Sequence, residues 1–121
     1  MTTVTPMIHV PDVAATARWY EGIGFEVLAT AEDGVETTWA QLALGATRVM
    51  LNCGGRPATH DRRDVDLYVE TDDVEAFRRR FDGRADLDLV EDLHDTFYGM
   101  REFIIRDPNG FWITFGQTVS G

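Results

Sequence analysis

The chain has 121 residues, of which 44% are apolar, a composition typical of one soluble globular domain and unlike that of a disordered chain. Its formal net charge of −10 disfavours nucleic acid and anionic membrane surfaces as partners. No apolar run is long enough to cross a bilayer, and the first residues do not resemble a secretory signal. The single cysteine, Cys53, excludes an internal disulfide, so we expect a cytoplasmic protein.

The first part of the chain predicts a strand, a helix and a second strand. Residues 5–10 alternate as in a strand, and Asp12 stands where a helix N-cap belongs. Gly22 is placed where a helix ends in a left-handed turn, and strand-like sequence resumes at 25–29. The buried stripe of the predicted helix consists of Val13, Ala17 and Tyr20.

Two further strands are predicted before the middle of the chain. Residues 37–44 and 47–53 alternate, and the short Gly45-Ala46 segment between them predicts a tight turn. Residues 57–63 are polar and form a predicted linker.

The second part repeats this order. An alternating stretch at 65–70 leads to Asp73, a second N-cap position, and Gly83 matches Gly22. The second predicted helix buries Val74, Phe77 and Phe81. The remaining strands are predicted at 87–91, 100–106 and 111–117, with a turn at 107–110 joining the last two.

The repeat defines the expected fold class. We predict a single α+β domain, residues 1–121, made of two tandem β-α-β-β-β modules at 1–56 and 64–121. The strands would form a curved, antiparallel-rich mixed sheet with a concave ligand cup. The short linker allows the modules to pair within one chain or to swap between two chains.

Alternation separates each strand into an apolar face and a mixed face. The apolar face, predicted to pack under the helices, consists of Ile8, Val10, Leu42, Leu44, Val49, Leu51, Leu67, Val69, Phe103, Ile105, Ile113 and Phe115. The mixed face consists of Thr5, Met7, His9, Trp39, Gln41, Met50, Asn52, Asp66, Tyr68, Glu70, Glu102, Ile104, Trp112, Thr114 and Gly116. Its aromatic rings and scattered polar groups are typical of a ligand-binding concavity, or alternatively of a face that packs against another subunit or against the other half of the protein. The two interpretations are compatible if a dimer interface forms the pocket wall.

Two segments carry a family resemblance. The ending Arg-Asp-Pro-Asn-Gly-Phe-Trp-Ile-Thr-Phe at 106–115 and the stretch Arg-Trp-Tyr-Glu-Gly-Ile-Gly-Phe-Glu at 18–26 resemble the vicinal oxygen chelate superfamily. This superfamily includes glyoxalase I, extradiol dioxygenases, fosfomycin-resistance enzymes and bleomycin-resistance proteins. The resemblance covers nearly the whole chain and implies the paired-module fold, which hosts several chemistries.

The resemblance also indicates where metal ligands would stand. Metal-dependent members place ligands at the positions of Thr5, Asp66 and Thr114, of which only Asp66 is a strong ligand for a divalent ion. A catalytic metal site needs about three protein ligands. We therefore expect no metal and no other cofactor, as in the metal-free bleomycin-resistance branch.

Histidine and acidic residues extend the predicted site. His9 is interpreted as a hydrogen-bonding residue of a pocket or interface, with a metal or catalytic role as the alternative. His60 in the linker and His94 in a polar loop are expected to be solvated. Acidic groups on the mixed face would suit a cationic ligand stacked on its aromatic rings, unless they pair with Arg48 or Arg101 at the rim. The predicted ligand-binding residues are Met7, His9, Trp39, Gln41, Asn52, Asp66, Tyr68, Glu102, Trp112 and Thr114.

Three functions compete at this point. The first is a homodimeric, metal-independent binding protein of the bleomycin-resistance type, which sequesters a small molecule and has no catalytic residues. The second is a lyase, isomerase or dioxygenase with a non-standard site. It would use metal ligands at positions other than those named above, or acid–base chemistry through Glu102, His9 or Asp66. The third is a regulatory module whose mixed face is only a dimer interface.

Overall fold

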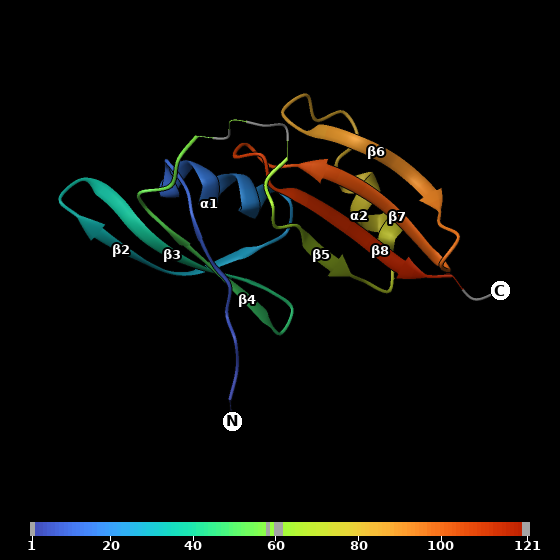
Figure 1. The fold of residues 1–121 in the computed structure, drawn as a ribbon, viewed down its shortest axis with the longest axis horizontal. Coiled ribbons are helices and arrows are strands. Elements are labelled where there is room, and N and C mark those ends of the chain that lie inside the picture. The colour runs from blue at the N-terminus through green and yellow to red at the C-terminus, as the bar shows by residue number, and fades with distance from the viewer. Residues whose placement is uncertain (1, 58, 60–61, 120–121) are drawn as a thin grey trace. The chain divides into compact units, whose positions relative to one another are not determined.

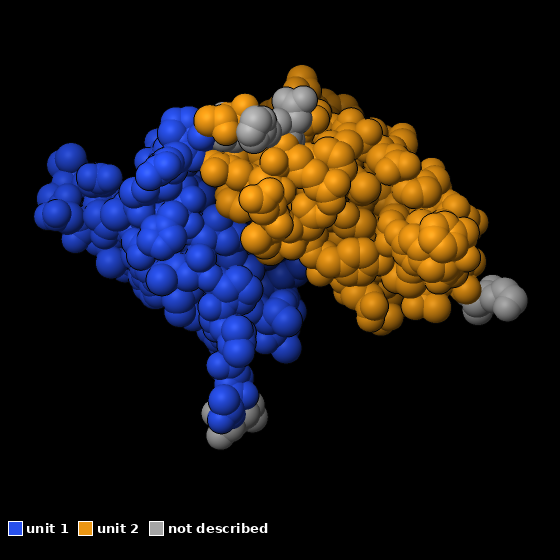
Figure 2. Space-filling view, viewed as in Figure 1, with its two compact units in different colours: residues 1–57 blue, residues 58–121 orange. Residues whose placement is uncertain are grey.

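A computed structural model describes residues 2–57, 59 and 62–119. The chain divides into two compact units, residues 1–57 and 58–121 (Figure 2). Each unit repeats the order β-α-β-β-β. The predicted α+β class is confirmed, with one helix and one four-stranded mixed sheet in each unit. His60 and part of the predicted linker lie outside the described residues.

The first unit forms a sheet in the strand order β1-β4-β3-β2. The β1 strand is parallel to β4, and the other neighbours are antiparallel. The elements are β1 (Met7–His9), α1 (Val13–Gly22), β2 (Glu26–Asp33), β3 (Glu36–Leu44) and β4 (Thr47–Asn52).

The second unit has the same topology, in the order β5-β8-β7-β6 with β5 parallel to β8 (Figure 1). Its elements are β5 (Leu67–Glu70), α2 (Val74–Arg80), β6 (Asp88–Asp95), β7 (Met100–Arg106) and β8 (Trp112–Thr118). Among the described residues, neither helix is long and apolar enough to span a membrane.

Both helices begin at the predicted caps. Asp12 Oδ1 accepts the Ala15 N–H at 2.9 Å, and Asp73 Oδ1 accepts the Ala76 N–H at 3.0 Å. The prediction for Gly22 was wrong, because α1 continues through it and the residue with a positive φ of 113° is Gly24. Gly83 has the expected left-handed φ of 76°.

The predicted apolar face forms the core of each unit. Nine of its twelve residues are buried, and Leu44, Leu67 and Val69 are half-buried. In the second unit the rings of Phe103 and Phe115 stack with centroids 4.8 Å apart, and Phe81 from the end of α2 packs edge-on against both. The helix α2 therefore covers the apolar face, behind the sheet in Figure 1, and leaves the mixed face uncovered by this helix.

Two strands are longer than predicted. The β2 strand runs to Asp33 and β6 runs to Asp95, although alternation in both sequences fades near residues 29 and 91. Both are edge strands with register shifts, so that backbone pairing with β3 and β7 continues where side chains of both faces are exposed. The turn between β2 and β3 begins at Gly34, whose φ is 64°.

Candidate ligand-binding faces

The register of the first sheet places six predicted residues on one face. Met7 pairs with Met50 and His9 with Asn52 across β1 and β4, while β3 adds Gln41 and Trp39 to the same two rows. Met7 and His9 are exposed, and the others are half-buried. The result is a surface rich in sulfur and aromatic groups with amide and imidazole edges, which suits contact with a flat, apolar ring.

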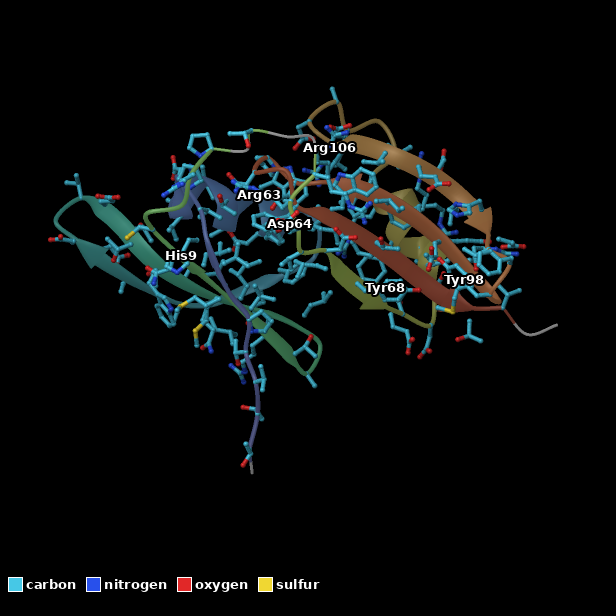
Figure 3. All side chains as sticks on the ribbon, viewed as in Figure 1. His9, Arg63, Asp64, Tyr68, Tyr98 and Arg106 are labelled. Carbon is cyan, nitrogen blue, oxygen red and sulfur yellow. The ribbon has the colours of Figure 1, made fainter. Side chains whose placement is uncertain are left out.

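The polar side chains of this face are anchored to the end of the sheet. His9 Nδ1 lies 3.0 Å from the Cys53 carbonyl oxygen, which can only accept, so Nδ1 carries a proton. Asn52 Oδ1 accepts the Cys53 N–H at 2.9 Å, and Asn52 Nδ2 lies 3.7 Å from Met7 Sδ. The His9 ring is thereby oriented (Figure 3), and its role in a pocket or an interface stays a prediction.

A close backbone approach supports this edge of the first sheet. The Gly55 N–H donates to the Val10 carbonyl at 3.2 Å, and a Cβ at residue 55 would lie 2.3 Å from backbone atoms of His9 and Val10. Only glycine allows this approach without displacement of β1.

In the second unit, a buried carboxylate lies between two tyrosines. Glu102 on β7 is 4% exposed, and its Oε2 accepts the Tyr68 hydroxyl at 2.8 Å. Its Oε1 accepts the Tyr98 hydroxyl at 2.7 Å. Tyr68 reaches it from β5 and Tyr98 from the loop between β6 and β7, so the two phenols approach from different sides (Figure 3). Tyr68 and Glu102 were predicted, whereas Tyr98 was not.

A glycine makes the Tyr68 contact possible. Gly116 on β8 lies in register with Glu102, and Tyr68 crosses over it to reach the carboxylate. A Cβ at residue 116 would lie 2.1 Å from the Tyr68 hydroxyl oxygen and 2.7 Å from Cζ. Thr114, the cross-strand neighbour of Tyr68, is buried at 9% exposure.

The carboxylate changes the acidity of both phenols. Burial and then the hydrogen bond to Glu102 raise the pKa of Tyr68 well above its ordinary value. The pKa of Tyr98 is raised first by its hydrogen bond to Glu102, while the Thr96 side chain acts weakly in the opposite direction. Both phenols therefore keep their protons at neutral pH.

The remaining predicted aromatic residue is engaged by a cation of the chain itself. The Arg62 guanidinium lies 4.1 Å from the centre of a Trp112 ring and forms an ion pair with Asp66. Arg101 does not pair with a mixed-face carboxylate at the rim but contacts Asp95 at 2.8 Å and Glu75 at 3.0 Å.

The positions aligned with metal ligands differ in their surroundings. Thr5 is half-buried in the first unit, Asp66 is paired with Arg62, and Thr114 is buried in the second unit. Among the residues that the structure describes, no three His, Cys, Asp or Glu side chains are grouped so that they could hold a metal ion.

The prediction for His94 was wrong in its location. It lies in β6 and not in a loop, is half-buried, and has its Nδ1 3.0 Å from the Asp92 carbonyl oxygen. The paired β6 backbone extends past the point where sequence alternation fades, and this extension includes His94.

A separate pocket of about 280 Å³ lies in the second unit, beside the end of α2. Its wall includes Phe81, Leu89 and Ile105 together with two arginines. Both arginines are paired, Arg78 with Asp92 at 2.8 Å and Arg84 with Asp86 at 2.7 Å. The pocket contains none of the predicted ligand-binding residues.

The repeated β-α-β-β-β units, with one face of each sheet covered by a helix and the other carrying polar and aromatic groups, define the class of paired-module α+β proteins. The model of the Glyoxalase/Bleomycin resistance protein/Dioxygenase superfamily matches residues 3–115, and the chain belongs to this superfamily. No curated protein sequence matches the chain.

Solved structures share the fold at low sequence identity. TioX from Micromonospora sp. ML1 is 22% identical with a TM-score of 0.80, covering 98% of this chain and 100% of that one. A bleomycin-binding protein complexed with bleomycin is 19% identical with a TM-score of 0.70, covering 98% and 99%. A bleomycin resistance determinant encoded on the transposon Tn5 is also 19% identical, with a TM-score of 0.71 and 98% coverage of both chains.

Proposed function

We propose that the chain is a cytoplasmic, homodimeric binding protein that sequesters a cationic or aromatic small molecule without a metal ion, in a cup formed at the dimer interface. Its biological effect would then be resistance to a toxic compound, obtained by binding and not by chemical conversion. The residues proposed to contact the ligand are Met7, His9, Trp39, Gln41, Asn52, Asp66, Tyr68, Glu102, Trp112 and Thr114.

The composition of the two mixed faces carries this proposal. Each sheet is covered by its helix on one face only, and the opposite face bears aromatic rings, thioethers and oriented polar groups. A face exposed only to water gains nothing from such side chains, whereas a ligand with a flat ring and polar substituents can use all of them.

The comparisons lend support of a second kind. The superfamily that the chain belongs to includes bleomycin resistance proteins by name, and one neighbour of the same fold was solved as a complex with bleomycin. Bleomycin is therefore a suitable first test compound, although the identity of 19% shows only the shared fold.

A thermal-shift screen tests the proposal directly. The compounds are bleomycin as a cationic glycopeptide, tryptamine as an aromatic amine and benzoate as an anionic control. A ligand at one hundred times its Kd stabilises the folded state by about 2.7 kcal/mol, which is readily seen as a rise in Tm. The absence of any rise with bleomycin or aromatic amines, at concentrations far above micromolar, would contradict the proposed function.

Two further measurements test its other parts. Sedimentation equilibrium should give the mass of two chains, and a monomer that binds ligand with full affinity would contradict the interface cup. Metal analysis of protein purified without chelators or a metal-affinity tag should find no stoichiometric divalent ion. A stoichiometric ion whose removal abolishes ligand binding would favour the enzyme interpretation instead.

A further inference from the structure

The Tyr68–Glu102–Tyr98 cluster has used all its hydrogen-bond donors internally. Each phenol has one proton, and each of these protons is donated to a different oxygen of Glu102. A carboxylate is an acceptor only, with about four lone-pair sites, two of which the phenols occupy. The three side chains therefore have only acceptor sites left for further hydrogen bonds.

The acceptors are accessible although the carboxylate is buried. Tyr68 is 50% exposed and Tyr98 is 57% exposed, so both phenol oxygens can be reached from solvent. Phe97, beside Tyr98, is 99% exposed, and the two rings meet edge-on with centroids 5.1 Å apart. An apolar surface thus adjoins the acceptors.

Among the described residues, the side-chain charges that raise the pKa of the two phenols come from carboxylates. Glu70 acts on Tyr68 and Glu91 on Tyr98, in addition to Glu102. Arg101 is the neighbour of Glu102 in sequence, but alternation directs it to the helix face, where it contacts Glu75 of α2. His94 lies in register with Glu102, and its ring is held between the Asp92 carbonyl and Glu91.

From these contacts we propose that Tyr68, Glu102 and Tyr98 form a subsite for an organic cation that carries several N–H donors, such as an amidinium, guanidinium or primary ammonium group, joined to an apolar body. A quaternary ammonium group has the charge but no donor, and an anion or a carbonyl group meets only acceptors. The inference rests on the proposed binding function and specifies the ligand class at one part of the mixed face.

A matched series of probes tests the donor requirement. Benzamidine, benzyltrimethylammonium and benzoate share a phenyl ring and differ in charge and N–H donors. We expect benzamidine to bind with a Kd of about millimolar order, as suits so small a molecule. The quaternary ion should bind at least about tenfold more weakly, because charge-assisted hydrogen bonds contribute roughly 1.5–3 kcal/mol. Ring resonances of Tyr68 and Tyr98 in NMR spectra locate the contact.

Variants distinguish binding at this subsite from attraction of cations by the overall negative charge of the chain. Glu102→Gln should weaken benzamidine binding by about tenfold or more and remove the preference over the quaternary ion, since the new amide donates to a phenol and frees its proton to point outward. Tyr98→Phe, at an exposed position that does not threaten folding, should weaken it severalfold. Glu26→Gln removes the same charge from an exposed position of β2 and should change nothing.

The outcomes distinguish this inference from the proposed function. Benzamidine that binds without moving the tyrosine resonances, binds Glu102→Gln or Tyr98→Phe as tightly as the native protein, or does not bind at tens of millimolar overturns the subsite. If bleomycin or tryptamine still stabilises the protein in any of these cases, the binding function stands without it. If no compound binds, both fail.

Discussion

Two glycines, Gly55 and Gly116, would each collide with a neighbour if replaced by alanine, and we predict very different costs. The Cβ of Gly55→Ala would lie 2.3 Å from backbone atoms of His9 and Val10, about 1 Å short of ordinary contact at 3.4 Å. Backbone atoms cannot rotate away from the new Cβ as a side chain can, so the end of β1 must move. That movement strains the Gly55–Val10 hydrogen bond of 3.2 Å.

The magnitude follows from these contacts. Overpacking costs about 1–3 kcal/mol and each weakened hydrogen bond about 1 kcal/mol, which suggests a loss of about 3 kcal/mol for Gly55→Ala. In Gly116→Ala the colliding group is the outer end of Tyr68, which is 50% exposed and can swing into water. The lost bond to Glu102 is then partly offset by water and by the lower chain entropy of alanine, so that we expect a loss of about 1 kcal/mol.

Urea unfolding measures both values. At an m-value of about 1.5 kcal/mol/M, Gly55→Ala should lower the midpoint by about 2 M and Gly116→Ala by less than about 1 M. Gly22→Ala is the control, because Gly22 is an exposed, helical residue at the end of α1, where alanine should be neutral or slightly stabilising. Equal midpoints for the Gly55 and Gly116 variants would refute the distinction between backbone and side-chain collisions.

Three further changes test separate contacts. Glu102→Gln should lower the raised pKa of Tyr68 toward 10.0 in a titration of tyrosinate absorbance; the pair stabilises the fold below that pH, and its contribution is lost as the pH rises through the folded-state pKa. Arg62→Ala should raise the affinity of benzyltrimethylammonium for Trp112 severalfold by fluorescence titration, because the Arg62 guanidinium then no longer competes for the ring; unchanged affinity would exclude this competition. Asp12→Ala should cost about 1 kcal/mol in urea unfolding through loss of the N-cap, and a native midpoint would count against it.

The fold was largely predictable because its signals are local. The Asp12 and Asp73 caps precede their helices directly. Alternation along the strands identified nine buried residues of the apolar face, although Glu102 and Thr114 of the mixed face are buried as well. The left-handed residue was misplaced by two positions because both Gly22 and Gly24 suit the end of a helix; α1 includes Gly22, its C-cap is Ile23, and Gly24 has the positive φ.

Side-chain partnerships across the sheet were not predictable in the same way. Tyr98 lies in a loop without periodicity, and its role depends on reaching Glu102 around the end of β7. Arg62 lies within the predicted linker, 57–63, and pairs with Asp66, whereas the sequence offered Arg48 and Arg101 as partners. The Tyr68–Glu102 contact depends on the register of Glu102 with Gly116 and on the space that Gly116 leaves, neither of which a local sequence pattern gives.

The repeat explains why the core was easier to predict from the sequence than the site. By register, Leu51 in β4 corresponds to Phe115 in β8, and both are buried and apolar because each must pack under a helix. On the opposite face the same comparison matches Trp39 with Glu102, an indole with a carboxylate. Packing against the helix limits what can replace a core residue, whereas no such limit acts on the mixed face. Under the proposed binding function, ligand specificity should therefore be sought in pairs of positions where the two modules differ, and Glu102 with its two phenols is the clearest of them.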